Sequence, residues 1–270
     1  MQTPILMIHG MCCTGDVWSH FREFFEARGA TVFTPTLRAE ERVSISNARP
    51  PRGLRELSLH DYVRELDQVI EQIEQETGRV PAVIGHSMGG LLAQVLAERN
   101  LVRAAVFLSP AAPAGTHILS NRLFWQGLLL AKRFGLRQPL IRPDHRTVGA
   151  MVLNAMPKEL RQAAWQAMVW ESGLVFEEFA NFPVDETKIR IPVLTVAATR
   201  DRLITAPLVR RTARKYAAIG GDFREYQTHG HWLYAEPGWE NAAQDIYAWL
   251  AGAVERSAVP ALSERPQAQL

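Results

Sequence analysis

A chain of 270 residues, 47% hydrophobic and 21% charged, has an ordinary globular composition and room for one large domain or two small ones. A formal net charge of +2 gives no electrostatic basis for binding nucleic acid or a membrane surface. No apolar run reaches the ~18 residues of a transmembrane helix, which excludes stable membrane insertion. The chain enters an apolar run almost at once, and its only cysteines, Cys12 and Cys13, are adjacent. We therefore expect no signal peptide, no disulfide and a cytoplasmic location.

Alternating strand and helix patterns occupy the first 110 residues and return after residue 186. Apolar runs predict buried strands at residues 5–8, 80–84, 104–108 and 191–198, and two further strands are expected at residues 30–33 and 223–226. Apolar residues at helical spacing predict helices at residues 16–28, 59–77, 91–97, 210–216 and 241–253. Ser58, with Asp61 three residues later, predicts a capped start for the second of these helices. Such an alternation is typical of a parallel sheet covered by helices, so we predict an α/β fold.

The turn between the strand at residues 80–84 and the helix at residues 91–97 contains Gly-x-Ser-x-Gly, with Ser87 at its centre. Strand, sharp turn and helix are the context in which this pattern presents a nucleophile. Larger side chains would collide at Gly85 and Gly89, and the helix N-terminus favours developing negative charge. We therefore predict that Ser87 is a nucleophile. The alternative, a chance match in a loop, is disfavoured by the strand and helix on either side.

Between residues 37 and 57 the alternation stops, and prolines and glycine interrupt the chain. The segment contains five arginines: Arg38, Arg42, Arg49, Arg52 and Arg55. We favour an irregular, solvated loop, because surface arginines usually bind no ligand. A clamp for an anionic substrate is the alternative, since the loop leaves the C-terminal edge of a strand, where ligands bind in α/β sheets.

Residues 111–186 interrupt the alternation a second time. Helical patterns rich in Trp and Phe occur at residues 119–134, 147–153, 158–170 and 173–179. We expect most of these aromatic side chains to hold the segment together and some to form the apolar ceiling of a cleft. The predicted organisation is a core of residues 1–110 and 187–254, an insertion of residues 111–186, and a disordered tail of residues 255–270.

The sequence Gly-His-Ser-Met-Gly-Gly at residues 85–90 follows a strand, and His-Gly at residues 9–10 ends an earlier one. In order and spacing, about residues 4–250 resemble the α/β-hydrolase superfamily, especially its single-domain esterases and lipases. The resemblance implies a mostly parallel sheet of about six strands flanked by helices. In this family the turn that bears the nucleophile, here Ser87, is called the nucleophile elbow, and residues 111–186 would be a helical cap inserted after the strand that follows the elbow. The family commonly has two further strands before the first one here. The sheet edge exposed by their absence would favour association, although the sequence sets no oligomeric state.

The resemblance also implies a catalytic site. Matched position by position, Ser87 is the nucleophile, His231 the base and Asp201 the acid, in the chain order Ser, Asp, His. The backbone N–H groups of Met11 and Met88, which follow the His-Gly turn and the nucleophile, form the oxyanion hole.

Several nearby residues offer alternatives to this assignment. His229 competes with His231, but two residues away on an extended segment its side chain should point to the opposite side. Asp201 could instead cap a helix. Asp222 is another acid, but it precedes its strand and so belongs to the opposite edge of the sheet. For His9 we favour a role in bracing its turn.

We expect Cys12, Trp125 and Trp232 to contact the substrate. Cys12 follows the His-Gly turn that carries Met11, Trp125 lies in the aromatic-rich insertion, and Trp232 follows the base, His231. A nucleophilic Cys12 is the alternative, which Ser87 in the elbow disfavours, and buried free cysteines usually behave as small hydrophobes. No cluster with metal-ligand spacing and no Gly-rich phosphate loop occurs, so we expect neither a metal nor a cofactor.

The expected function is hydrolysis of a small-molecule carboxylic ester or thioester with an apolar acyl group, through an acyl-Ser87 intermediate. An acyltransferase, a lyase or a cofactor-free oxygenase could use the same triad. A non-catalytic ligand receptor on the same fold is a further alternative.

Overall fold

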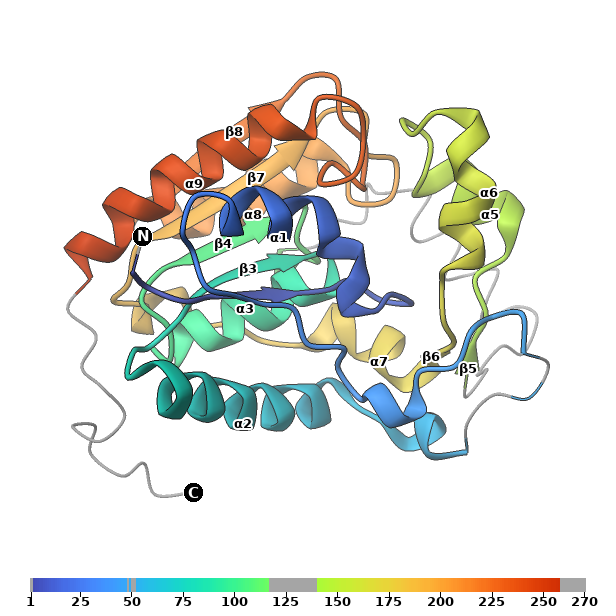
Figure 1. The fold of residues 1–270 in the computed structure, drawn as a ribbon, viewed down its shortest axis with the longest axis horizontal. Coiled ribbons are helices and arrows are strands. Elements are labelled where there is room, and N and C mark those ends of the chain that lie inside the picture. The colour runs from blue at the N-terminus through green and yellow to red at the C-terminus, as the bar shows by residue number, and fades with distance from the viewer. Residues whose placement is uncertain (1, 48, 50–51, 117–139, 258–270) are drawn as a thin grey trace.

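Six parallel strands form the centre of the protein in the computed structural model, which describes residues 2–47, 49, 52–116 and 140–257 (Figure 1). Their order across the sheet is β2-β1-β3-β4-β7-β8, and every neighbouring pair is parallel. The strands are β1 (Ile5–Ile8), β2 (Val32–Phe33), β3 (Ala82–His86), β4 (Ala105–Leu108), β7 (Val193–Ala198) and β8 (Asp222–Tyr226). The predicted α/β fold and its six-stranded parallel sheet are confirmed, and β3, which leads to Ser87, lies inside the sheet.

Helices cover both faces of this sheet (Figure 1). Along β1, Leu6 and Ile8 contact one hydrophobic core, whereas Ile5 and Met7 contact the other. This follows from the period of two along a strand, and burial on both faces explains the continuous apolar runs in the sequence. The first core includes side chains of α2 (Leu59–Thr77) and α3 (Met88–Glu98), and the second those of α1 (Ser19–Glu26) and α9 (Trp239–Arg256). A further helix, α8 (Ala206–Ala217), packs beside β7 and β8.

The register of the strands brings the predicted site segments to one edge of the sheet. Ile8 of β1 is level with Gly85 of β3, which is level with Phe107 of β4, Thr195 of β7 and Phe223 of β8. Because parallel strands all end at the same edge, the loops that follow β1, β3, β7 and β8 meet there. These loops carry all the residues predicted for the triad and the oxyanion hole.

The ends of the helices agree with the sequence in some places and differ in others. At the start of α2, the Ser58 hydroxyl accepts from the Asp61 N–H and the Asp61 carboxylate accepts from the Ser58 N–H, which confirms the predicted capping box. The first turn predicted for α1 is instead a short 3₁₀ helix, Gly15–Trp18. Near the C-terminus, α9 continues to Arg256, past residue 255 where the tail was predicted to begin, and residues 258–270 lie outside the described ranges. No helix within those ranges is long and apolar enough to cross a membrane.

The described part of the insertion contains short helices and one small antiparallel strand pair. Its elements are β5 (Leu140–Ile141), α5 (His145–Met151), α6 (Lys158–Gln166), β6 (Glu171–Ser172) and α7 (Gly173–Glu178). The helix predicted at residues 119–134, and Trp125 within it, lie outside the described residues. The predicted helix at residues 158–170 ends early, because the chain from Met168 onward pairs with the arginine-rich loop. The division of the chain into core and cap stays a prediction.

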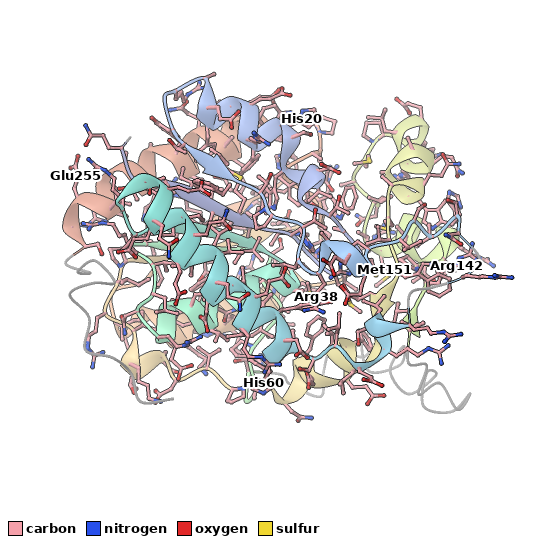
Figure 2. The ribbon with its side chains drawn as sticks, turned by 60° about the horizontal axis from the view of Figure 1, so that its bottom comes forward. His20, Arg38, His60, Arg142, Met151 and Glu255 are labelled. Atoms are coloured by element: carbon pink, nitrogen blue, oxygen red, sulfur yellow. The ribbon has the colours of Figure 1, made fainter. Side chains whose placement is uncertain are left out.

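Backbone hydrogen bonds join the insertion to the loop at residues 37–57. The Ile45 N–H donates to the Met168 carbonyl (3.1 Å), and the Trp170 N–H donates to the Val43 carbonyl (3.1 Å). From the insertion, the Arg142 guanidinium also donates to the Ile45 carbonyl (3.0 Å). Figure 2 labels Arg142 at the right of the molecule. The loop and the insertion are therefore connected along their backbones.

The prediction that all five arginines of this loop are solvated is wrong for Arg42. Its side chain is only 2% exposed and forms an ion pair with Glu171 of β6. Arg49, Arg52 and Arg55 are exposed, as expected for a solvated loop. Arg42 differs because the insertion packs against the loop and places the buried Glu171 carboxylate beside it. Local sequence does not reveal this contact.

Candidate active site

Ser87 lies in a strained turn between β3 and α3. Its backbone has φ 55° and ψ −115°, a region that residues other than glycine rarely adopt. The turn is possible only with glycine on either side, because a Cβ at Gly85 would lie 2.0 Å from the Gly89 carbonyl oxygen, and a Cβ at Gly89 would lie 2.2 Å from that of Ile8. The Ser87 carbonyl accepts from the Ala111 N–H (2.9 Å), which fixes the turn from the other side. The nucleophile predicted from the motif is therefore held rigidly at the N-terminus of α3.

His231 and Asp201 form a buried hydrogen-bonded pair. The distance between His231 Nδ1 and Asp201 Oδ2 is 2.7 Å, and the two side chains are 3% and 0% exposed. The other carboxylate oxygen, Oδ1, accepts from the Leu203 and Ile204 N–H groups at 2.8 Å each, so capping a turn and binding the imidazole are compatible tasks for Asp201. Because a carboxylate accepts, Nδ1 donates, which leaves Nε2 with a free lone pair, as a general base needs.

The His231 ring lies beside the elbow. Its centroid is 4.6 Å from that of His86, the residue that precedes Ser87. His229 is placed differently: its ring packs against Tyr226 (5.9 Å) and its nearest polar side-chain partner is Thr228. The structure thus brings His231, and not His229, to Asp201. The other rival acid, Asp222, accepts from the Trp249 indole (2.7 Å) at the start of β8, on the opposite edge.

The turn after β1 lies against the elbow. A Cβ added to Gly10 would be 3.2 Å from Ser87 Cβ, so this turn passes directly beside the nucleophile. Within the described part of the chain, the Met11 N–H has no acceptor. Met88 is the first residue of α3, and the first N–H groups of a helix have no partner inside it. Both predicted oxyanion donors are therefore available for a ligand.

Two comparisons place this architecture among known proteins. The model that describes the alpha/beta hydrolase family matches residues 5–243 of the chain. The chain belongs to the alpha/beta hydrolase family. The predicted membership is thereby confirmed, and a search of curated proteins finds no match.

Solved structures share the fold of this alpha/beta hydrolase at low sequence identity. Polyneuridine aldehyde esterase is similar at 17% identity and a TM-score of 0.66, over 91% of this chain and 99% of its own. A monoacylglycerol lipase of Paleococcus ferrophilus matches at 20% identity and a TM-score of 0.65, over 93% and 96%. Tomato methylketone synthase I, in complex with 2-tridecanone, matches at 16% identity and a TM-score of 0.68, over 94% and 99%.

Residues that the sequence did not indicate hold the backbone of His231 in this hydrolase. His86 Nε2 donates to the His231 carbonyl (2.8 Å). The buried Glu236 carboxylate accepts from the N–H groups on either side, Gly230 (2.5 Å) and Trp232 (3.3 Å). Their partners are peptide groups, which no spacing of side chains reveals. The sequence offered only two signals for these roles: Glu236 is an acid in the segment that follows His231, and His86 lies inside the elbow motif.

His9 braces the turn after β1, as expected. The Leu37 N–H donates to His9 Nε2 (3.0 Å), so Nδ1 carries the proton and donates to the Gly10 carbonyl (2.8 Å). Both ring nitrogens are satisfied only in the neutral form. Burial, together with the positive charge of Arg42, lowers the pKa of His9 from 6.5 to about 4.

We expect the folded hydrolase to lose stability as the pH falls from ~6.5 to ~4. The pKa of His9 is lower in the folded state than in the unfolded chain, so the unfolded chain binds more protons within this window. For His9 alone the loss amounts to roughly 3 kcal/mol at pH 4, and burial likewise lowers the pKa of His86. Urea unfolding at several pH values measures it. The matched variant His9→Gln should be less stable at pH 7 but have a flatter pH dependence, and a wild-type curve that is flat over this range would contradict the expectation.

The predicted substrate-contacting residues have different environments. Cys12 is buried, and burial followed by the nearby Glu171 carboxylate raises the pKa of its thiol well above the ordinary value, which opposes a nucleophilic role. Trp232 is 6% exposed and packs against Tyr234, with 5.9 Å between ring centroids. Trp125 lies outside the described residues. Substrate contact by these three residues stays a prediction.

A surface pocket of about 460 Å³ lies between α5 and α6. Its lining consists of His145, Arg146, Gly149, Lys158, Arg161 and Gln162. None of them belongs to the predicted site. In the described residues, no group of three His, Cys, Asp or Glu side chains is arranged to hold a metal ion.

Proposed function

We propose that this alpha/beta hydrolase cleaves a carboxylic ester or thioester through an acyl-Ser87 intermediate. The observation that carries the proposal is the 2.7 Å hydrogen bond between His231 and Asp201, with the imidazole beside the elbow that bears Ser87. Nucleophile, base and acid on three loops at one sheet edge are what acyl transfer to serine requires. The esterase and the lipase that share the fold support the same class of reaction.

In the proposed mechanism, His231 Nε2 removes the proton from the Ser87 hydroxyl as its oxygen attacks the acyl carbon. Asp201 holds the imidazole in the required tautomer and stabilises its cationic form. The Met11 and Met88 N–H groups stabilise the oxyanion of the tetrahedral intermediate. The imidazolium then protonates the leaving alcohol or thiol, and a water molecule activated by His231 releases the acid.

Covalent labelling and ester turnover together test this proposal. A fluorophosphonate should label the wild-type protein and not Ser87→Ala, and the wild-type protein should release p-nitrophenol from p-nitrophenyl butyrate. Labelling without ester turnover would favour a lyase or an oxygenase that uses the same triad. Turnover that rises with added alcohol or thiol would favour acyl transfer. Absence of both labelling and turnover would favour a receptor.

We expect esters with small or medium apolar acyl groups to be preferred over esters whose acyl group carries a carboxylate. Burying an anion without a partner costs several kcal/mol, and the one buried arginine of the loop, Arg42, is already paired with Glu171. The value of kcat/KM for p-nitrophenyl hexanoate should exceed that for the p-nitrophenyl monoester of adipic acid by about tenfold or more. Equal values, or faster cleavage of the anionic ester, would contradict this preference.

Small-molecule esters are thus the proposed partners. The cytoplasm is the proposed location, which the adjacent free cysteines Cys12 and Cys13 support.

A further inference from the structure

Among the described residues, the most deeply buried carboxylate outside the triad is that of Glu171, on β6 of the insertion. Its side chain is 0% exposed and accepts hydrogen bonds on both oxygens. Oε1 accepts from the Tyr62 hydroxyl (2.6 Å) and the Ser172 N–H (2.9 Å). Oε2 accepts from the Arg42 guanidinium (2.9 Å) and the Cys12 N–H (3.2 Å). Four donors from four parts of the chain thus converge on one carboxylate.

Glu171 is held in its ionised form. Burial alone would raise the pKa of Glu171, but the Arg42 charge and the hydrogen bonds from Tyr62 and Ser172 lower it below its ordinary value. The Arg42 guanidinium is fixed in turn, since it donates to the Leu37 carbonyl (2.8 Å) and the Tyr62 hydroxyl (2.8 Å). A charged acceptor in a fixed position forms stronger hydrogen bonds than a neutral one.

One of the four donors to the Glu171 carboxylate, the Cys12 N–H, belongs to the turn after β1, which also carries the predicted oxyanion donor Met11. Cys12 follows Met11 directly, and its backbone has φ 61°, which residues with a side chain rarely adopt. Glu171 binds the Cys12 N–H, and the Val169 N–H of the same insertion segment donates to the Cys12 carbonyl (3.0 Å). Both polar groups of this strained residue are therefore held by the insertion, while His9 holds the turn at Gly10.

We propose that Glu171 is a positioning residue for the oxyanion hole: by binding the Cys12 N–H it fixes the turn that aims the Met11 N–H at the substrate carbonyl. This inference rests on the proposed function. It gives the insertion a part in the chemical step, through the backbone of the core. An oxyanion donor acts only when it is aimed at the developing charge before the reaction begins, so a freed turn loses transition-state stabilisation before it loses substrate binding.

The test compares variants at a temperature well below their unfolding midpoints. Glu171→Met removes every acceptor on the carboxylate, and the double variant Arg42→Met/Glu171→Met also removes the buried charge that would be left, so the fold is retained. Ser172→Ala is the matched control, because Ser172 lies in the same strand as Glu171. The substitution removes the hydrogen bond from the Ser172 hydroxyl to the Leu57 carbonyl (2.6 Å) and leaves the contacts of Cys12 in place.

Ester turnover and an oxyanion probe are the two readouts. In the double variant kcat should fall about 10-fold to 100-fold with KM changed less than about threefold, since losing a whole oxyanion donor costs about 10²-fold to 10³-fold. An alkyl trifluoromethyl ketone, which forms a hemiketal oxyanion with the serine, should lose affinity by a similar factor. Ser172→Ala should retain both values.

The outcomes separate this inference from the proposed function. Unchanged kcat and unchanged trifluoromethyl ketone affinity in a folded double variant would overturn the positioning role while leaving the hydrolase assignment intact. A rise in KM alone would also overturn it, because it would indicate a role in substrate binding. Failure of the wild-type protein to hydrolyse esters or to react with a fluorophosphonate would instead remove the proposed function.

Discussion

Ser87→Ala, His231→Ala and Asp201→Asn are each expected to lower kcat/KM by about 10³-fold or more while the protein stays folded. Ser87→Ala removes the attacking oxygen and His231→Ala removes the base. Asp201→Asn replaces the acceptor of the 2.7 Å hydrogen bond and so permits the wrong imidazole tautomer, although its Oδ1 position can still accept from Leu203 and Ile204. Ester hydrolysis and circular dichroism measure the two parts of this expectation.

Combining two of these substitutions should cost little more than the worse single one, because the three side chains act as a unit. His229→Ala is the matched control, since His229 is also buried but, in the described part of the chain, forms no hydrogen bond or ion pair with Asp201, and it should retain most activity. An inactive His229 variant beside an active His231 variant would exchange their roles. Full activity in Ser87→Ala would remove the nucleophile assignment.

Arg42→Met is expected to lower the free energy of unfolding by about 3–5 kcal/mol, the usual effect of removing one member of a buried ion pair. The Glu171 carboxylate, fully buried, would lose the one charged partner that it has among the described residues, and the Leu37 and Trp170 carbonyls would lose a donor. Adding Glu171→Met should restore most of the loss, because the uncompensated charge is then gone. Urea unfolding at pH 7 measures all three proteins.

Arg210→Met provides the control for this stability effect. Arg210 forms a bidentate pair with Glu225, but its side chain is 46% exposed, so its removal should cost about 1 kcal/mol or less. A similarly small cost for Arg42→Met would contradict an ionised, desolvated pair at Glu171.

Local sequence was sufficient for the elements on which the candidate site is built. The inner strands were evident because burial on both faces demands continuous apolar runs, and the elbow was evident because only glycine fits at Gly85 and Gly89. The order of residues then indicated which loops meet at one edge of a parallel sheet. These features depend on chemistry that lies within a few residues along the chain.

The residues that hold the site in place could not be predicted in this way. Arg42 and Glu171 lie 129 residues apart, and Cys12 lies 159 residues from Glu171. An arginine in an irregular loop is usually solvated, and the prediction for Arg42 followed this general tendency. The ion pair with Glu171 forms only when the insertion folds against the loop, so local sequence could not indicate it. His86 and Glu236 act on peptide groups, which leave no side-chain pattern to recognise.

The backbone pairing between the insertion and the core also limits how substrate can enter. Three backbone hydrogen bonds, from Ile45, Val169 and Trp170, lie close to the buried pair of Arg42 and Glu171. At about 1 kcal/mol for each backbone bond, and more for the ion pair, lifting this end of the insertion as a rigid body would cost several kcal/mol. In the proposed reaction, we therefore expect the segment at residues 168–171 to stay in place while substrate enters and the acid leaves.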